Sequence, residues 1–222
     1  MRWRNFLKVL IYISNYTVFS QFNVGARVGT QLASIATFRY LEKPKMILVP
    51  SGGLLLKYDW RGGLGLQSEV NFVIKGYKSM YESNRTNHFE IPILIRLDVP
   101  VPLGENYKAY GLCGPYIGTT LNRKFTFSDS ITKRSVENAY RNARIFEFGW
   151  NLGAGFMFPY KIGNFFGEFR YSFALTNVTR GYTMDRYRYF GLFIGYLFPI
   201  SVLKLNRQAT TPEKLMTIPD IN

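Results

Sequence analysis

The sequence is nearly devoid of the residues on which metal and redox chemistry depend. Cys113 is the only cysteine and His88 the only histidine among the 222 residues. A single cysteine excludes an intrachain disulfide, and the cysteine pair of a zinc motif is missing. We therefore expect neither a bound metal nor a cofactor.

Long apolar runs and acidic residues are also scarce. No run of about 18 or more apolar residues occurs, which excludes a membrane-spanning helix. Asp and Glu number 14 against 28 Lys and Arg, so the net charge is +14. This surplus predicts an anionic partner, namely nucleic acid, phospholipid head groups or lipopolysaccharide phosphates, and charge alone does not separate the three.

The two ends of the chain differ from the middle. Residues 1–20 are predicted to be a signal peptide, because Arg2 and Arg4 precede a short apolar run and the small Ser20 precedes Gln21. A first amphipathic strand or an interfacial helix is the alternative. Residues 199–222 are polar and contain prolines, and they are predicted to form a periplasmic tail.

Aromatic residues are abundant, at 17% of the chain, and they alternate with polar or small residues. From residue 146 to 158, every second residue is apolar, whereas Glu147, Asn151 and three glycines occupy the positions between. Residues 165–175 repeat the pattern, with Glu168 and Arg170 on the polar side. A period of two over such lengths indicates strands, so rings and charges point to opposite faces.

The same alternation predicts eight strands within residues 21–198, joined by connections that alternate between short and long. Short turns at one end and long loops at the other are typical of an outer-membrane barrel. We therefore predict an all-β fold, an eight-stranded antiparallel up-and-down transmembrane β-barrel. The long loops are expected near residues 37–46, 77–87, 122–143 and 176–186. A soluble barrel of lipocalin type, with its apolar face inward, is the alternative.

The apolar faces extend for about nine to eleven residues without a charge, which suits a tilted membrane span. The opposite faces would then line a lumen that eight strands leave filled and non-conducting. The charges predicted to form a lumen network are Glu69, Glu90, Arg96, Glu147, Glu168 and Arg170. The aromatic residues predicted to lie at the membrane interfaces are Trp60, Tyr77, Tyr107, Phe158, Tyr160 and Tyr187. Pro92 is expected to require a bulge, and residues 50–53 to interrupt their strand.

Several segments resemble the PorT-like outer-membrane β-barrel family of Bacteroidetes. The segments that carry the resemblance are LQSEVNFVIKGYK, FEIPILIRL, YGLCGPYIGTTL, GWNLGAGFMF, GEFRYSFALTNV and RYFGLFIGYLF, in the family's order. The resemblance implies a small barrel in the outer membrane of a Gram-negative bacterium. It implies function only weakly, because the namesake is linked to type IX protein secretion and most members have no assigned activity.

Two candidate sites follow from the chemistry of single residues. His88, with a loop residue such as Ser83, Ser128 or Asp129, would be needed for hydrolysis, but no spacing supports such a triad and we expect no enzyme. Basic loop residues suit lipopolysaccharide phosphates better than nucleic acid. These residues are Arg123, Lys124, Lys133, Arg134, Arg141, Arg144, Arg180, Arg186 and Arg188.

The leading functional hypothesis is a non-enzymatic scaffold or accessory subunit in secretion or envelope assembly. Such a protein would meet other envelope proteins through its long loops or its tail. A small transport or adhesion barrel is the second hypothesis, and a lipid-modifying enzyme is the third.

Overall fold

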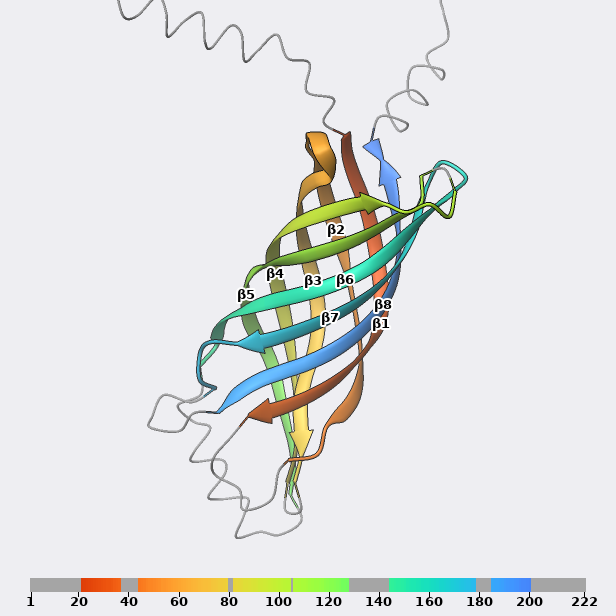
Figure 1. Cartoon of the computed structure of the whole chain (residues 1–222). Helices are drawn as coiled ribbons and strands as arrows, with labels where there is room; N and C mark the ends of the chain where they lie inside the picture. Colours follow the sequence, from red (N-terminus) through yellow and green to blue (C-terminus); the bar gives the residue numbers. More distant parts are fainter. Residues whose placement is uncertain are drawn as a thin grey trace, which may run out of the picture.

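The computed structural model describes residues 21–36, 44–79, 82–104, 106–127, 144–178 and 185–200. Eight strands in chain order form a closed antiparallel barrel, in which β8 pairs back to β1 (Figure 1). The predicted fold class is thereby confirmed. The strands are β1 Gln21–Ala36, β2 Ile47–Asp59, β3 Leu64–Lys78, β4 Glu82–Pro100, β5 Lys108–Phe127, β6 Phe146–Tyr160, β7 Gly163–Ala174 and β8 Arg186–Pro199.

The connections give the barrel two different ends. At the turn end lie the short 3₁₀ segment η1 (Arg61–Gly63), the β4–β5 and β6–β7 turns, the start of β1 and the end of β8 (Figure 1). The ends of β1, β3, β5 and β7 and the starts of β2, β4, β6 and β8 lie at the opposite end, the loop end. No helix within the described ranges is long and apolar enough to cross a membrane. The predicted signal peptide and nearly all of the predicted tail lie outside the described residues.

One of the predicted long loops is wrong. Residues 77–87 are mostly strand, because Tyr77 pairs with Asn84 and Lys78 with Ser83, so the β3–β4 hairpin continues almost to its tip. Likewise β5 continues to Phe127, beyond its predicted end at residue 121. Continued backbone pairing, which the side-chain pattern does not report, explains both differences.

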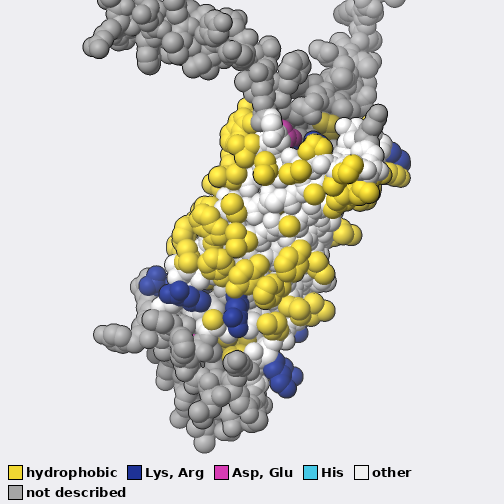
Figure 2. All heavy atoms as spheres, viewed as in Figure 1, with side chains coloured by type: hydrophobic (Ala, Val, Ile, Leu, Met, Phe, Trp, Pro, Cys, Tyr) yellow, Lys and Arg dark blue, Asp and Glu magenta, His cyan; other side chains and the backbone are white. Residues whose placement is uncertain are grey.

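Large apolar side chains cover the outside of the barrel. Leu54 and Ile194 are each 67% exposed and Val28 is 61% exposed, and Figure 2 shows many such side chains between the two ends. The charged positions of the same strands are buried inside. This polarity is that of a membrane barrel and the reverse of that of a soluble barrel.

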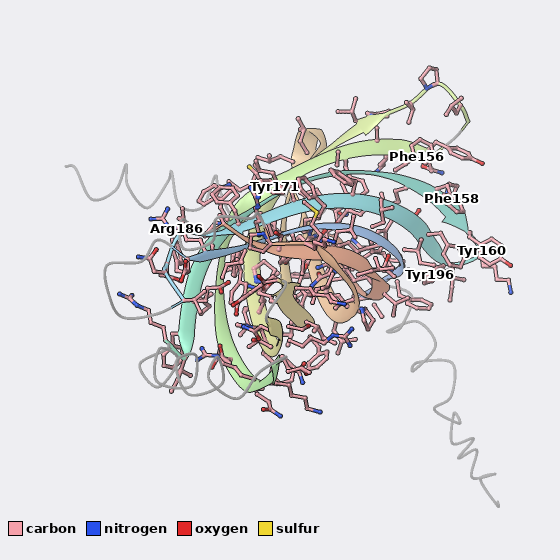
Figure 3. The ribbon with its side chains drawn as sticks, turned by 90° about the horizontal axis from the view of Figure 1, so that it is seen from below. Phe156, Phe158, Tyr160, Tyr171, Arg186 and Tyr196 are labelled. Atoms are coloured by element: carbon pink, nitrogen blue, oxygen red, sulfur yellow. The ribbon has the colours of Figure 1, made fainter. Side chains whose placement is uncertain are left out.

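Aromatic rings form an outward girdle at the turn end. Phe165 contacts Phe158, Tyr160 and Tyr196, with ring centroids 5.8, 5.2 and 4.7 Å away. Figure 3 shows Tyr160 and Tyr196 at one end of the sheet and Arg186 at the other. Trp60 is 40% exposed at the same end, and Tyr107 contacts Phe156.

Tyr77 and Tyr187 do not belong to an interfacial girdle, and this prediction is wrong. Tyr77 is 0% and Tyr187 2% exposed, and both lie in the lumen at the loop end. Tyr77 lies two positions after Lys75 on β3, and Tyr187 lies two positions before Tyr189 on β8. Lys75 and Tyr189 both face inward. The phase of the alternation therefore decides the face, whatever the closeness to a strand end.

The two predicted irregularities are also wrong in their position. The β3–β4 and β4–β5 registers are the same on both sides of Pro92. The pairing with β3 is interrupted at Ile91 and Pro92, and the pairing with β5 at Ile93 and Leu94. The register shift of β4–β5 lies at Asn87 and His88 instead. The β2 strand continues through residues 50–53, with Pro50 opposite Thr30. Proline lacks an N–H group, so a closed sheet can hold it at the loss of one ladder bond without a change of register.

Candidate functional site: a layered lumen and a basic loop end

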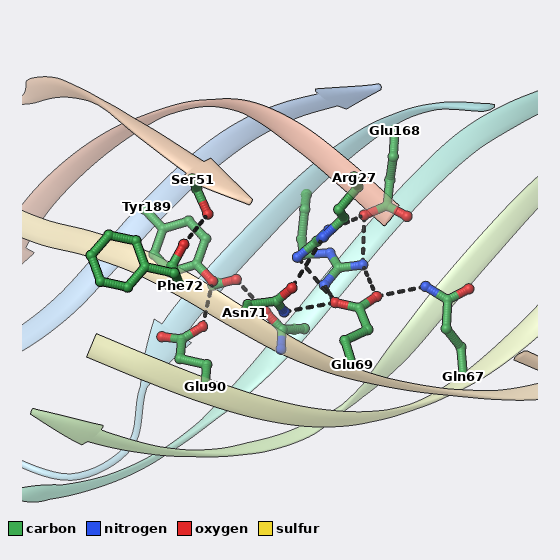
Figure 4. Close-up of polar contacts among 12 residues, drawn as sticks. Arg27, Ser51, Gln67, Glu69, Asn71, Phe72, Glu90, Glu168 and Tyr189 are labelled. Carbon is green, nitrogen blue, oxygen red and sulfur yellow. Dashed lines mark hydrogen bonds and ion pairs between the residues drawn. The ribbon is translucent and has the colours of Figure 1, made fainter. Parts of the chain in front are cut away.

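The centre of the lumen holds two carboxylates and two guanidinium groups that contact each other. Arg170 binds Glu69 through both terminal nitrogens, at 2.7 and 2.8 Å, and also reaches Glu168 at 2.6 Å. Arg27 bridges the same carboxylates, 3.0 Å from Glu69 and 2.9 Å from Glu168. All four side chains are at most 1% exposed. The formal charges of this central layer cancel (Figure 4).

Neutral side chains complete the hydrogen bonding of the two carboxylates. Gln67 and Asn71 donate to Glu69 over 2.6 and 2.8 Å, and the Tyr110 hydroxyl donates to Glu168 over 3.2 Å. The charges come from β1, β3 and β7, so the layer joins strands on opposite sides of the barrel. A buried ion pair persists only when such additional donors satisfy the remaining lone pairs.

Gly53 provides the space in which Arg27 and Asn71 meet. It lies directly opposite Arg27 on β1 and Asn71 on β3, and the Arg27 Nε donates to the Asn71 Oδ1 over 3.3 Å. A Cβ atom on Gly53 would lie 2.1 Å from that Oδ1 and 2.6 Å from the Val70 carbonyl oxygen. The strand was predicted to be interrupted at residues 50–53. Instead it continues, and Gly53 supplies the small residue that the central layer requires at this position.

A second charged layer lies nearer the turn end. The Lys57 ammonium contacts Asp98 at 2.5 Å and Asp59 at 2.7 Å. Arg96 donates to Asp98 over 2.6 Å and lies over the Tyr110 ring, 3.5 Å from its centroid. Two cations and two anions again balance.

A third charged layer lies nearer the loop end and is not balanced. Lys75 contacts Glu90 at 2.5 Å and also contacts Glu147. The Tyr189 hydroxyl donates to Glu90 over 2.8 Å, and the Tyr116 hydroxyl donates to Glu147 over 2.5 Å. One ammonium thus serves two carboxylates, and phenol hydroxyls supply the remaining donors.

Apolar clusters lie between and beyond the charged layers, and Gln67 links two of these layers, because it accepts from Arg96 over 2.9 Å and donates to Glu69 over 2.6 Å. Their side chains are buried on the same inward faces as the charges, so apolar and charged side chains together occupy the lumen. The cluster nearest the turn end consists of Leu55, Leu94, Tyr110, Leu112, Met157, Phe166 and Leu197. The middle cluster consists of Ala33, Ile47, Val49, Val73 and Tyr189. The loop-end cluster consists of Ile35, Tyr77, Ala174, Val178 and Tyr187.

The structure places all six charges of the predicted network in the lumen, but in three separate layers. Glu69, Glu168 and Arg170 meet in the central layer. Arg96 lies in the turn-end layer, whereas Glu90 and Glu147 share the loop-end layer. The sequence reasoning missed five charged members of these layers, and the inward phase of their strands was the available signal. They are Arg27, Lys57, Asp59, Lys75 and Asp98.

His88 is not placed for hydrolysis at the membrane surface. Its side chain is 1% exposed and faces the lumen, beside the Tyr187 ring at a centroid distance of 5.8 Å. The Thr120 hydroxyl lies 3.5 Å from its Nδ1. Ser83 belongs to the outward-facing set of β4, and Ser128 and Asp129 lie outside the described residues.

Exposed charge on the described barrel is basic. Of the acidic side chains described, Asp59 at the turn end is the only one that is not buried. Figure 2 shows Lys and Arg gathered at the loop end, below the apolar band. Among the predicted phosphate contacts, Lys124, Arg144, Arg186 and Arg188 are exposed there and Arg123 is half-buried. Outside the described residues lie Lys133, Arg134, Arg141 and Arg180.

Three further exposed cations at the loop end were not predicted. They are Lys45, Lys78 and Arg85. The sequence reasoning assigned their surroundings to loops and did not consider an outward strand face. Arg85 in fact lies within β4, and Lys78 ends β3.

Comparison with known proteins agrees with the barrel architecture. The profile of the outer membrane protein beta-barrel domain matches residues 14–180, three quarters of the chain. The chain belongs to this family. The protein is therefore a small eight-stranded barrel of the Gram-negative outer membrane. In such barrels the short turns face the periplasm and the longer loops face outside.

Solved barrels resemble this member of the family at low identity. Ail of Yersinia pestis, in complex with the heparin analogue sucrose octasulfate, is 15% identical, with a TM-score of 0.44 over 80% of this chain and 99% of its own. Neisserial surface protein A is 12% identical, with a TM-score of 0.48 over 78% and 95%. The outer membrane enzyme PagL is 12% identical, with a TM-score of 0.42 over 78% and 97%. No protein of curated function matches the chain significantly.

Proposed function

We propose that this barrel is a non-enzymatic, non-conducting scaffold or accessory subunit of an envelope assembly, with type IX protein secretion as its pathway. The observation that carries the proposal is the lumen, which three charged layers and three apolar clusters fill along its length. A filled lumen gives solutes no path, so function falls to the surfaces that other molecules can reach. The strand motifs shared with PorT-like proteins support the choice of pathway.

The geometry around the sole histidine supports the non-enzymatic part of the proposal. A lipid-modifying barrel needs a nucleophile and a base that reach the membrane-facing surface. His88 is buried in the lumen, and the Tyr187 ring lies beside it on the loop side. An acyl chain in the outer leaflet would not reach this side chain.

The turn end offers a surface on which a periplasmic partner could dock. A recess of about 270 Å³ opens there between β1, β2, β5, β6, β7 and β8. Lys108 and Lys161 line it together with Asn23 and Asp59. We propose another envelope protein as the partner at this end or at the outer loops, and lipopolysaccharide phosphates as the lipid partner of the basic loop end.

Purification and conductance test the proposal together. A tagged chain would be isolated from native outer membranes in mild detergent, and proteins and lipids that accompany it would be identified by mass spectrometry. A stoichiometric envelope protein supports the accessory role and identifies the pathway. A barrel that emerges alone and forms steady single channels in planar bilayers would contradict the proposal and favour transport.

Adhesion through the outer loops is the second candidate function. The observation in its favour is that the exposed charges described at the loop end are all basic, as binding to acidic surface polymers would require. Cells that express the barrel would then bind immobilised heparin more strongly than cells without it. Equal binding by the two would remove this candidate.

A further inference from the structure

Four cations on one outward wall of the loop end form a compact group, the basic quartet: Lys45, Lys78, Arg85 and Lys124. Lys45 and Lys78 lie directly opposite each other, joined by backbone hydrogen bonds of 2.7 and 3.1 Å. Arg85 lies directly opposite Lys124. Lys78 pairs with Ser83, two residues before Arg85, so the two pairs occupy neighbouring rows of the same face. All four side chains are exposed.

Both pairs of the basic quartet join like charges. Like charges directly opposite each other on a sheet are destabilising. Within the described part of the chain, no hydrogen bond or ion pair links any of the four side chains to another residue. The acidic side chains described are buried, apart from Asp59 at the far end. Among the described residues these four cations therefore have no anionic partner and repel one another, and a bound anion would relieve this repulsion.

Two other basic residues of the loop end, Arg123 and Arg186, are engaged differently. Arg123 donates to the Arg144 carbonyl oxygen and to the Thr120 hydroxyl. Arg186 donates to Asn177 over 3.1 Å. These two guanidinium groups already have acceptors within the chain, whereas the four side chains of the basic quartet have none among the described residues.

The wall below the basic quartet has the polarity profile of a membrane boundary. One row further from the loop end, Asn87 lies opposite Asn122. Next come Phe72 and Phe89, whose rings meet edge to face at a centroid distance of 5.9 Å. Ile91 follows at 44% exposure. From Arg85 to Phe89 is about 13 Å along the strand, so the cations stand just above the ring that borders the apolar band.

We propose that the basic quartet is a binding site for the phosphate groups of a lipid anchored in the outer leaflet. Arginine takes a phosphate through two parallel hydrogen bonds and lysine as a point charge. Three strand spacings, about 14 Å, separate Lys45 from Lys124, which is enough for two phosphates on one sugar head group. The acyl chains of such a lipid would lie along Phe72, Phe89 and Ile91. The inference rests on the lipid partner proposed above and assigns it one site.

The test compares two variants that lose equal charge at the same end. Arg85→Gln/Lys124→Gln removes one like-charged pair from the basic quartet, and Arg186→Gln/Arg188→Gln on β8 is the matched control. The full-length barrel in detergent would be titrated with purified lipopolysaccharide, with the same material after phosphatase treatment, and with heparin. Samples would be heated to graded temperatures and run on SDS gels without boiling. The temperature at which the folded band disappears is the unfolding temperature, and its rise with added ligand measures binding.

We expect lipopolysaccharide to raise the unfolding temperature of the unaltered barrel and of the control, and phosphatase treatment to remove most of the rise. Loss of two surface cations should weaken binding by the Arg85→Gln/Lys124→Gln variant by about 30-fold. Without ligand, this variant should unfold no earlier than the parent, because a repulsive pair has been removed.

Three results would overturn the inference, each for a different reason. Undiminished binding by Arg85→Gln/Lys124→Gln together with weakened binding by the control would keep the lipid partner but move its site to β8. Binding of heparin as tight as that of lipopolysaccharide would indicate a soluble polyanion in place of a lipid. No response of the unaltered barrel to lipopolysaccharide would remove both the site and the proposed lipid partner.

Discussion

Arg170 on β7 and Glu69 on β3 form a two-bonded ion pair across the middle of the lumen, with N–O distances of 2.7 and 2.8 Å. The pair ties together strands that are not neighbours in the barrel. Its charges are almost fully buried, so each depends on the other for the interactions that water would otherwise supply. Loss of the central layer would therefore destabilise several strands at once.

Arg170→Ala should strongly destabilise the barrel. It leaves Glu69 and Glu168 with Arg27 as the only remaining cation of the central layer. Removing one partner of a buried pair costs about 3–5 kcal/mol, which should appear as a lower urea midpoint in detergent micelles. Arg188→Ala, which removes an exposed arginine from β8, is the control and should change the midpoint little. Equal midpoints for the two variants would contradict a stabilising role of the layer.

Gly53→Ala should destabilise the barrel although it adds a single methyl group. The new Cβ would lie 2.1 Å from the Asn71 Oδ1 and 2.6 Å from a backbone oxygen, so Asn71 or the strand must shift. Overpacking of this kind costs about 1–3 kcal/mol. Gly167→Ala on β7 is the matched control, because nothing lies within 4 Å of its added Cβ. The unfolding temperature of Gly53→Ala should therefore be lower than that of Gly167→Ala. A lower unfolding temperature for Gly167→Ala would refute the prediction.

The sequence was sufficient for the fold and for the face that each strand residue takes. A period of two assigns Glu69 and Arg170 to the same side of their strands, and the long apolar faces identify that side as the lumen. The sequence was not sufficient for the partners. Which charges meet across a barrel depends on the stagger between strands, and no local pattern reports it. Arg27 thus remained unassigned although its strand alternates.

The errors at Tyr77 and Pro92 have a common physical origin. Tyr77 was placed by its closeness to a strand end, although its phase puts it beside Lys75 in the lumen. Pro92 was expected to require a bulge, although the sheet loses only local pairing there and keeps its register. In both cases the continuous closed ladder of the barrel outweighed the preference of a single residue.

His88 should resist chemical modification in the folded barrel. This residue is 1% exposed, and its imidazole lies beside the Tyr187 ring at a centroid distance of 5.8 Å. Diethyl pyrocarbonate should therefore leave it unmodified in unboiled barrels and modify it after heat unfolding, as measured by the mass of the peptide that contains it. A barrel with Asn87→His adds an imidazole one position away on the outward face and should react there without heating. Rapid labelling of His88 in the native barrel would show that the lumen is open to solutes.

The loop-end layer should respond very unequally to loss of its cation and loss of one anion. Lys75 contacts both Glu90 and Glu147, so Lys75→Met leaves two buried carboxylates without a positive partner. This change should cost about 3–5 kcal/mol in the urea unfolding of the micelle-bound barrel. Glu147→Gln instead balances the layer at one positive and one negative charge, and its amide oxygen can still accept the hydrogen bond that Tyr116 donates. Its cost should be about 1 kcal/mol or less. If Glu147→Gln instead lowered the free energy of unfolding as much as Lys75→Met does, that result would contradict the prediction, because the excess negative charge of this layer would then have no consequence for stability.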